Sequence, residues 1–295
     1  MNDILLSVIV ATKDNSKSLL RLLESLDAQY MPAHHYEVLV ANAHSTDDTS
    51  SMVENLTFRY AMEHCVSRRQ GLMAARNQAV EQAKGDRLLF LSDDLVAPPT
   101  LLETHLQAHK DIPHHVVRGP IVPLETETIP MLDRPPPSIR LFFTINNSSA
   151  SKMAILKVGG FAENIDPELE DREVGWRLQQ DNWTERFVPE AYVYRPSTQE
   201  ETLLDLKRQA VLLARTAVAH YMQHPDPSVA KTTGIHPRAR AWARLTAGEG
   251  IYSVVRFLRD TSLGQVHWIR TLIEQRIFMT YYRRALTKEL EGKDL

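Results

Sequence analysis

Two adjacent carboxylates, those of Asp93 and Asp94, come one residue after the apolar run of residues 88–91. Such a run predicts a buried strand, and two neighbouring acids at its end repel one another unless a cation or an array of donors offsets their charge. Magnesium and manganese prefer oxygen ligands and are commonly held by one or two carboxylates together with the phosphates of a substrate. The pair is therefore a candidate metal site, although solvated surface pairs of the same composition are common.

A second acidic cluster lies in the segment PELEDREVGWRL, residues 167–178. Its acids gather where a helix is predicted to begin, at Glu168, Glu170, Asp171 and Glu173. The helix dipole favours carboxylates near an N-terminus, so helix stability alone accounts for acidic residues in general. A chemical role for Asp171 in particular needs a second, independent observation.

The segments that must position these acids alternate between apolar runs and longer helical patterns. Strands are predicted at residues 5–12, 36–43 and 87–92, and helices at 16–29, 46–57 and 71–85. Unbroken apolar strands joined by helices predict an α/β fold with a mixed, mainly parallel sheet flanked by helices. Ligands of such sheets bind beyond the carboxyl ends of the strands, where Thr12, Asn42, Asp93 and Asp94 fall. The paired acids are thus expected at the mouth of a cleft.

The rest of the chain divides into a proline-rich segment and a helical tail. Residues 113–140 contain many prolines and are interpreted as a loop or irregular wall over the cleft. From residue 203 onward the pattern is helical, with breaks at residues 224–228 and 234–238. The predicted domains are therefore 1–200, an α/β domain, and 201–295, a helical C-terminal region.

Composition narrows the class of protein. No stretch reaches the roughly 18 apolar residues of a membrane-spanning helix, and the single cysteine, Cys65, suits a reducing compartment. The N-terminal apolar run is interpreted as a buried strand and not as a signal peptide. These features favour a cytoplasmic location, with peripheral contact at the inner face of the membrane as the alternative.

The helical tail is basic, whereas residues 1–200 carry more acidic than basic side chains. Apolar residues of segment 251–286 recur at helical spacing, with arginines between them. Packing against the core is the favoured interpretation, and contact with an anionic membrane surface or a homodimer remains open. No nucleic-acid partner is predicted.

Six segments occur in one order along the chain: SVIVATKDN, VLVANAHSTDDT, GLMAARNQA, GDRLLFLSDD, NSSASKMAILKVGGF and EDREVGWRL. Together they resemble the family 2 glycosyltransferases, whose fold is the nucleotide-sugar-binding type called GT-A. The resemblance covers about residues 4–195. It implies a catalytic domain at 1–200 that moves a sugar from a nucleoside-diphosphate sugar to an acceptor hydroxyl with inversion.

The resemblance also implies roles for individual residues. Asp94 matches the last acid of the family's metal-binding motif, which implies Mn²⁺ or Mg²⁺ on the donor diphosphate, and Asp93 takes the variable middle position. Arg76 matches the family arginine near the base and diphosphate. Asp171 matches the base that takes a proton from the acceptor.

Other positions of the resemblance concern the donor and the acceptor. Thr12 falls in the donor-nucleotide region, and Asn147, Gly160 and Glu170 fall in the region of the transferred sugar and the acceptor. The glycine pair of residues 159–160 is equally explained as a simple turn. The acceptor is expected to be a glycan or a lipid-linked glycan of the cell envelope.

The chain departs from the family pattern at three sites. Ser92 replaces the aspartate that contacts the donor ribose, and Asn42 replaces the acid that reads the base. A UDP-sugar is favoured, while an amide also admits GDP- or dTDP-sugars. Arg195 stands where many members have a histidine near the metal; it could neutralise the leaving diphosphate or simply be a surface arginine.

Two other functions remain open at this point. A degenerate member of the family could bind a nucleotide or glycan without turnover, as the changes at Ser92 and Asn42 would allow. A sugar nucleotidyltransferase would share the architecture but needs a glycine-rich basic loop after the first strand. That place reads ATKDNSKS and holds no glycine.

Overall fold

A computed structural model describes residues 3–110, 114–123, 142–196, 203–233, 235 and 267–291. The chain divides into two compact units. The first takes in the described residues up to 196, and the second takes in those from 203 onward. Each unit is described below by itself.

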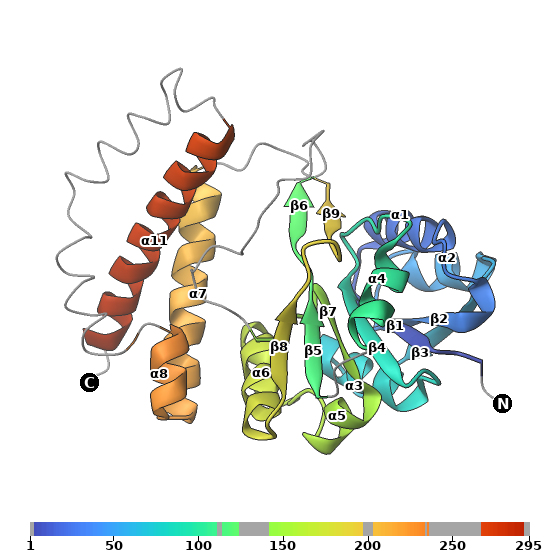
Figure 1. Ribbon diagram of the computed structural model, residues 1–295, viewed down its shortest axis with the longest axis horizontal. Coiled ribbons are helices and arrows are strands. Elements are labelled where there is room, and N and C mark those ends of the chain that lie inside the picture. Colours follow the sequence, from blue (N-terminus) through green and yellow to red (C-terminus); the bar gives the residue numbers. More distant parts are fainter. Residues whose placement is uncertain are drawn as a thin grey trace. The chain divides into compact units, whose positions relative to one another are not determined.

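The first unit is built on a seven-stranded sheet in the order β3-β2-β1-β4-β7-β5-β8 (Figure 1). Strands β1, β2, β3 and β4 run parallel, β7 runs antiparallel to β4 and β5, and β8 is parallel to β5. The expected mixed, mainly parallel sheet is confirmed. The strands are β1 (Leu6–Thr12), β2 (Tyr36–Asn42), β3 (Ala61–Val66), β4 (Arg87–Ser92), β5 (His115–Arg118), β7 (Asn147–Ser151) and β8 (Thr184–Phe187).

Helices cover both faces of this sheet, because the apolar strands present side chains alternately to two cores. One core joins Ile9, Leu39 and Phe90 to α3 (Leu72–Gln82), α5 (Lys152–Lys157) and α6 (Glu170–Gln180). The other joins Val8, Val38 and other strand residues to α1 (Ser16–Asp27), α2 (Thr49–Asn55) and α4 (Leu101–Ala108). Short 3₁₀ turns, η1 (Ala33–His35) and η2 (Pro167–Leu169), complete the unit.

Two features of this unit differ from the sequence-based expectation. Strand β3, between α2 and α3, was not predicted, because it lies at the edge of the sheet, has only one buried residue among six and does not form an apolar run. Within the segment interpreted as a loop, residues 114–123 form β5 and a further strand, β6 (Ile121–Pro123). The remainder, including the RPPPS sequence, lies outside the described residues.

A small second sheet pairs β6 with β9 (Val193–Arg195) in parallel. Strand β9 also contacts the segment after β4, through the mutual backbone hydrogen bonds of Val96 and Tyr194 at 2.8 and 2.9 Å. The carboxyl end of β4 is therefore tied to residues about 100 positions later in the chain.

The second unit contains α7 (Leu203–Gln223), α8 (Pro227–Thr233) and α11 (His267–Glu291). Helices α7 and α11 lie side by side and share a buried cluster (Figure 1). Its buried members are Ala210, Ala214, Ala217, Val218, Ile235, Tyr282, Leu286 and Leu290. The small residues of α7 let α11 approach closely. The expected helical C-terminal appendage is confirmed, and Ile277 is buried as its spacing predicts.

The helices of the described ranges include none that is both long and apolar enough to cross a bilayer. Most of segment 251–286, on which the membrane and dimer hypotheses rest, lies outside the residues whose side chains are described.

Candidate functional site

The topology brings the two predicted acidic clusters to one edge of the sheet. Strand β4 ends at Ser92, and the antiparallel β7 begins beside it, with Leu91 opposite Asn147. Adjacent strands lie about 4.8 Å apart. Residues just after β4 and residues just before β7 therefore emerge at the same edge. Asp171 accepts hydrogen bonds from Thr144 and Ile145, which come just before β7. Asp93, Asp94 and Asp171 therefore belong to segments that meet at the same edge of the sheet.

Asp93 is fastened to the end of β1. Its carboxylate accepts hydrogen bonds from Thr12 Oγ1 at 2.6 Å and from Asn15 Nδ2 at 2.9 Å. Burial raises the pKa of Asp93, and the two donors act in the opposite direction. Both oxygens are engaged within the chain, so Asp93 serves to lock the ends of β1 and β4 together. Ser92, also predicted to contact the donor, is partly buried at the last position of β4.

Asp94 has a different surrounding. Its Oδ2 lies 2.9 Å from Nε of Arg195, and its Oδ1 lies 3.4 Å from a terminal nitrogen of the same guanidinium. Both side chains are about two-fifths exposed, at 40% and 41%. The acid predicted to hold a metal is thus accessible from solvent and is already paired with a cation of the chain.

The turn after β2 is organised by Asn42, which is fully buried. Its Nδ2 donates to Ser50 Oγ at 2.8 Å, and its Oδ1 accepts from the backbone nitrogen of Ser45 at 2.8 Å. His44, two residues after Asn42, has a φ of 60° and is exposed. Asn42, which was expected to contact the nucleobase, therefore holds together the turn after β2. In the predicted complex it is this turn that would lie next to the nucleobase.

Sequence reasoning missed Asp14 at the same edge. Its carboxylate accepts from the backbone nitrogens of Thr46 and Asp47, at 2.5 and 3.3 Å. These bonds, that of Thr46 first, lower the pKa of Asp14. Its φ of 52° is unusual for a residue other than glycine. The TKDN sequence after β1 was the available signal.

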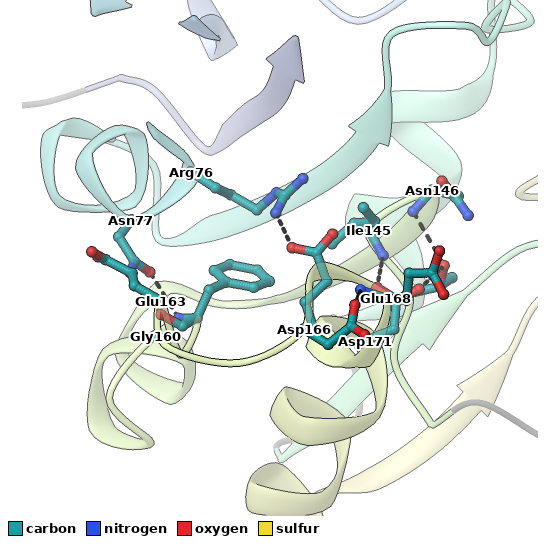
Figure 2. A network of polar contacts seen from close by, with 12 residues as sticks. Arg76, Asn77, Ile145, Asn146, Gly160, Glu163, Asp166, Glu168 and Asp171 are labelled. Carbon is teal, nitrogen blue, oxygen red and sulfur yellow. Dashed lines mark hydrogen bonds and ion pairs between the residues drawn. The ribbon is translucent and has the colours of Figure 1, made fainter. Parts of the chain in front are cut away.

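The first turn of α6 presents Asp171. One oxygen accepts from the backbone nitrogen of Ile145 at 2.8 Å, and the other accepts from Thr144 Oγ1 at 3.1 Å (Figure 2). Burial is the largest influence on this carboxyl and raises its pKa, and the hydrogen bonds partly offset that effect. A raised pKa makes the carboxylate a stronger base, and the two donors fix its orientation.

Glu170, the neighbour of Asp171, forms a buried ion pair with Arg76 of α3 (Figure 2). Their side chains are 9% and 5% exposed, and the guanidinium lies 5.0 Å from the ring centroid of Phe161. Burial is the main cause that raises the pKa of Glu170, and the charge of Arg76 opposes it. The described geometry makes Arg76 a brace between α3 and α6.

Gly160 forms part of the turn that leads to Phe161. Its φ of 67° suits glycine, and an added Cβ would lie 2.6 Å from Asn77 Oδ1. Asn77 in turn accepts from the backbone nitrogen of Phe161 and donates to its carbonyl oxygen, both at 2.8 Å. The glycine pair therefore makes a turn that seats Phe161 beneath Arg76.

Asn147 is fully buried at the start of β7. Its Nδ2 donates to the carbonyl oxygen of Ala191 at 2.7 Å, and its Oδ1 lies 2.9 Å from His105 Nε2. Burial lowers the pKa of His105 to about 4, so the imidazole is neutral. The side chain of Asn147 is thus committed to the sheet edge, where it joins β7 to α4 and to the segment before β9.

Known structures share this fold over nearly the whole chain. The mannosyltransferase PcManGT from Pyrobaculum calidifontis, in complex with GDP-Man and Mn²⁺, superposes with a TM-score of 0.64 at 17% identity and covers 98% of this chain and 87% of its own. Residues 1–349 of TarS from Staphylococcus aureus, in complex with UDP-GlcNAc, give 0.56 at 17% identity over 98% and 92%. The fold is that of the GT-A glycosyltransferases.

Sequence comparison identifies the family. A profile described as glycosyl transferase family 2 matches residues 7–158, more than half of the chain. The chain therefore belongs to glycosyl transferase family 2, as the six motifs predicted.

Curated relatives agree with this assignment. TarS of S. aureus strain Mu50, a poly(ribitol-phosphate) β-N-acetylglucosaminyltransferase, is 32% identical over 164 residues, which are 51% of this chain and 28% of that protein. The uncharacterised glycosyltransferase YfnE of Bacillus subtilis is 32% identical over 114 residues, 38% and 29% respectively. The chain spans less than a third of the length of these relatives.

Proposed function

We propose that this chain transfers a sugar from a nucleoside-diphosphate sugar to a hydroxyl of a cell-envelope glycan, by a single inverting displacement. The observation that carries the proposal is the placement of Asp171. It is partly buried at the start of α6, is oriented by Ile145 and Thr144, and lies at the sheet edge from which Asp94 also emerges. An inverting displacement requires a general base, here Asp171, and a group that binds the nucleotide sugar, here Asp94, at the same edge of the sheet.

In the proposed mechanism Asp171 accepts the proton of the acceptor hydroxyl as that oxygen attacks the anomeric carbon. The bond to the donor diphosphate breaks, and the nucleoside diphosphate leaves with the electron pair. General-base catalysis of this kind contributes about 10²- to 10⁴-fold in rate. The backbone nitrogen of Ile145 and the hydroxyl of Thr144 keep the carboxylate aimed during proton transfer. Arg76 acts at a distance, because it holds Glu170 and with it the first turn of α6.

A divalent cation fits the donor side on chemical grounds. The described residues contain no group of three or more His, Cys, Asp or Glu side chains able to hold a metal alone. Mg²⁺ and Mn²⁺, however, are commonly bound by one or two carboxylates plus substrate phosphates. The half-exposed Asp94 would supply such a carboxylate. When bound, the ion would neutralise charge on the leaving diphosphate.

The proposed donor is a UDP-sugar, with GDP- and dTDP-sugars as the other members of the panel. TarS was crystallised with UDP-GlcNAc and PcManGT with GDP-Man, so both bases occur on this fold. The nucleotide is proposed to lie along the ends of β1, β2 and β4. Thr12, Asn42 and Asp93 would order the backbone that meets it, and the partly buried Ser92 and Asp94 would contact it. Gly160 and Asn147 are proposed to act indirectly on the region that binds the transferred sugar and the acceptor. They would hold the backbone of that region in place without contacting either ligand. Because the relative TarS is a poly(ribitol-phosphate) β-N-acetylglucosaminyltransferase, poly(ribitol phosphate) is a first acceptor to test.

Thermal unfolding with UDP-, GDP- and dTDP-sugars, each with and without Mn²⁺, tests donor binding. Release of nucleoside diphosphate with a panel of envelope glycans then tests transfer. The proposal predicts that one donor raises Tm and is also consumed in an acceptor-dependent manner. A donor that raises Tm without turnover by any acceptor would instead indicate a binding protein, and formation of a nucleotide sugar from a triphosphate would indicate a nucleotidyltransferase.

A further inference from the structure

The ion pair between Arg195 and Asp94 bears on how the donor side accepts a cation. The guanidinium contacts both carboxylate oxygens of Asp94, at 2.9 Å and 3.4 Å. Those oxygens are the atoms that a divalent metal would coordinate. A guanidinium has no lone pair to offer a metal, so it cannot join the coordination shell. Arg195 and a metal therefore compete for the same two atoms.

The position of Arg195 is built into the fold. It is the last residue of β9, whose neighbour Tyr194 exchanges two backbone hydrogen bonds with Val96, two positions after Asp94. Strand β9 is in turn paired with β6 in parallel register. The base of the side chain is thus held beside Asp94, and the side chain as a whole is 41% exposed.

The neighbouring acid, Asp93, has other partners. It accepts hydrogen bonds from Thr12 and Asn15, one on each oxygen. The side chain of Asp94 is 40% exposed, and it is the carboxylate that Arg195 holds.

We propose that Arg195 is an internal cation that excludes a divalent metal from Asp94 until the donor diphosphate arrives. The diphosphate draws the guanidinium away and brings the metal, so metal and donor bind together. This assignment rests on the proposed function for its account of the donor, but not for the competition at Asp94 itself. It gives Arg195 a role in ordering ligand binding that an ordinary surface arginine lacks.

The test is a titration of the protein with Mn²⁺ in the absence of nucleotide sugar. Electron paramagnetic resonance measures the free Mn²⁺ at each point of the titration. We expect wild-type protein to bind weakly and Arg195→Gln, which keeps most of the side chain's length but removes its charge, to bind about tenfold more tightly. The double variant Asp94→Asn with Arg195→Gln should lose this gain. Arg59→Gln, in an exposed pair with Asp27 elsewhere on the unit, is the matched control and should behave as wild type.

Equal Mn²⁺ affinities of wild type and Arg195→Gln would overturn the proposal, as would a gain that persists in the double variant. Circular dichroism of each variant establishes that it is folded, and Arg195→Met provides a second neutral side chain. Because no donor or acceptor is present, this result is separate from that of the transfer assay. Failure of transfer would remove the proposed function and leave the competition at Asp94 standing.

Discussion

The end of β4 and the start of α6 each present an acid to the same edge of the sheet, in opposite surroundings. Asp94 is 40% exposed and pairs with an exposed guanidinium. Asp171 is partly buried, accepts one backbone and one hydroxyl hydrogen bond, and has a raised pKa because of burial. Exposure suits the binding of a charged ligand, whereas enclosure suits proton transfer. The environment, and not the residue type, thus separates the proposed roles of two aspartates.

The largest predicted effect is the loss of transfer rate when Asp171 is replaced. Asp171→Asn keeps the shape but removes the proposed base, so transfer should fall by about 10²- to 10⁴-fold while donor affinity is retained. Glu168→Gln removes an exposed carboxylate from the same cluster and should retain activity. The rates and a donor titration provide the measurement. A rate loss in Glu168→Gln with none in Asp171→Asn would move the base to Glu168.

The two ion pairs should differ strongly in stability. Arg76→Met leaves Glu170 buried without its partner and should lower the free energy of unfolding by about 3–5 kcal/mol. Arg195→Met breaks an exposed, solvent-screened pair and should cost about 0–1 kcal/mol. Denaturant unfolding measures both. A similar small loss for the two variants would contradict the bracing role given to Arg76.

Stability should also depend on pH through Asp171. A carboxyl whose pKa is raised on folding binds its proton more tightly in the folded state. Its contribution is therefore fully present below the unfolded pKa of about 3.9 and is lost as pH rises through the folded pKa. The Tm of wild type relative to Asp171→Asn should consequently fall as the pH rises above about 4. A constant difference in Tm over this range would show that the carboxyl is not perturbed.

The smallest predicted effect concerns the hydrogen bonds that hold the side chain of Asp93 in place. Asn15→Ala removes one of the two hydrogen bonds that Asp93 accepts. The variant should bind the nucleotide sugar more weakly by about 0.5–1.5 kcal/mol, with no change at Asp171. Isothermal titration with the donor found in the panel measures this change. If the rate at saturating donor falls as well, the two sides of the site are coupled more tightly than proposed.

Much of this arrangement was predictable from local sequence. The apolar runs of β1, β2 and β4 and the helical patterns between them predict the parallel half of the sheet, and strand ends predict where Thr12, Asn42 and Asp94 fall. The motif order predicted the family. The edge strand β3 and the inner strand β5 were missed, because only one of the six residues of β3 is buried and β5 lies in a proline-rich segment.

The pairings within the site were not predictable in the same way. Arg76 and Glu170 are 94 residues apart, and Asp94 and Arg195 are 101 residues apart. Single side chains carry no local signal of such partners, since the pairing depends on the order of strands in the sheet. For the same reason the sequence suggested ligand contacts for Asn42 and Asn147, whereas both amides are consumed by the scaffold.

The configuration of the transferred sugar tests the central claim most directly. With the donor and acceptor found in the panel, proton NMR of the first product formed reports the anomeric configuration before any equilibration. A single displacement with Asp171 as base predicts a product of configuration opposite to that of the donor. Retention of the donor's configuration would contradict the account, because it would require a second displacement that this site does not explain.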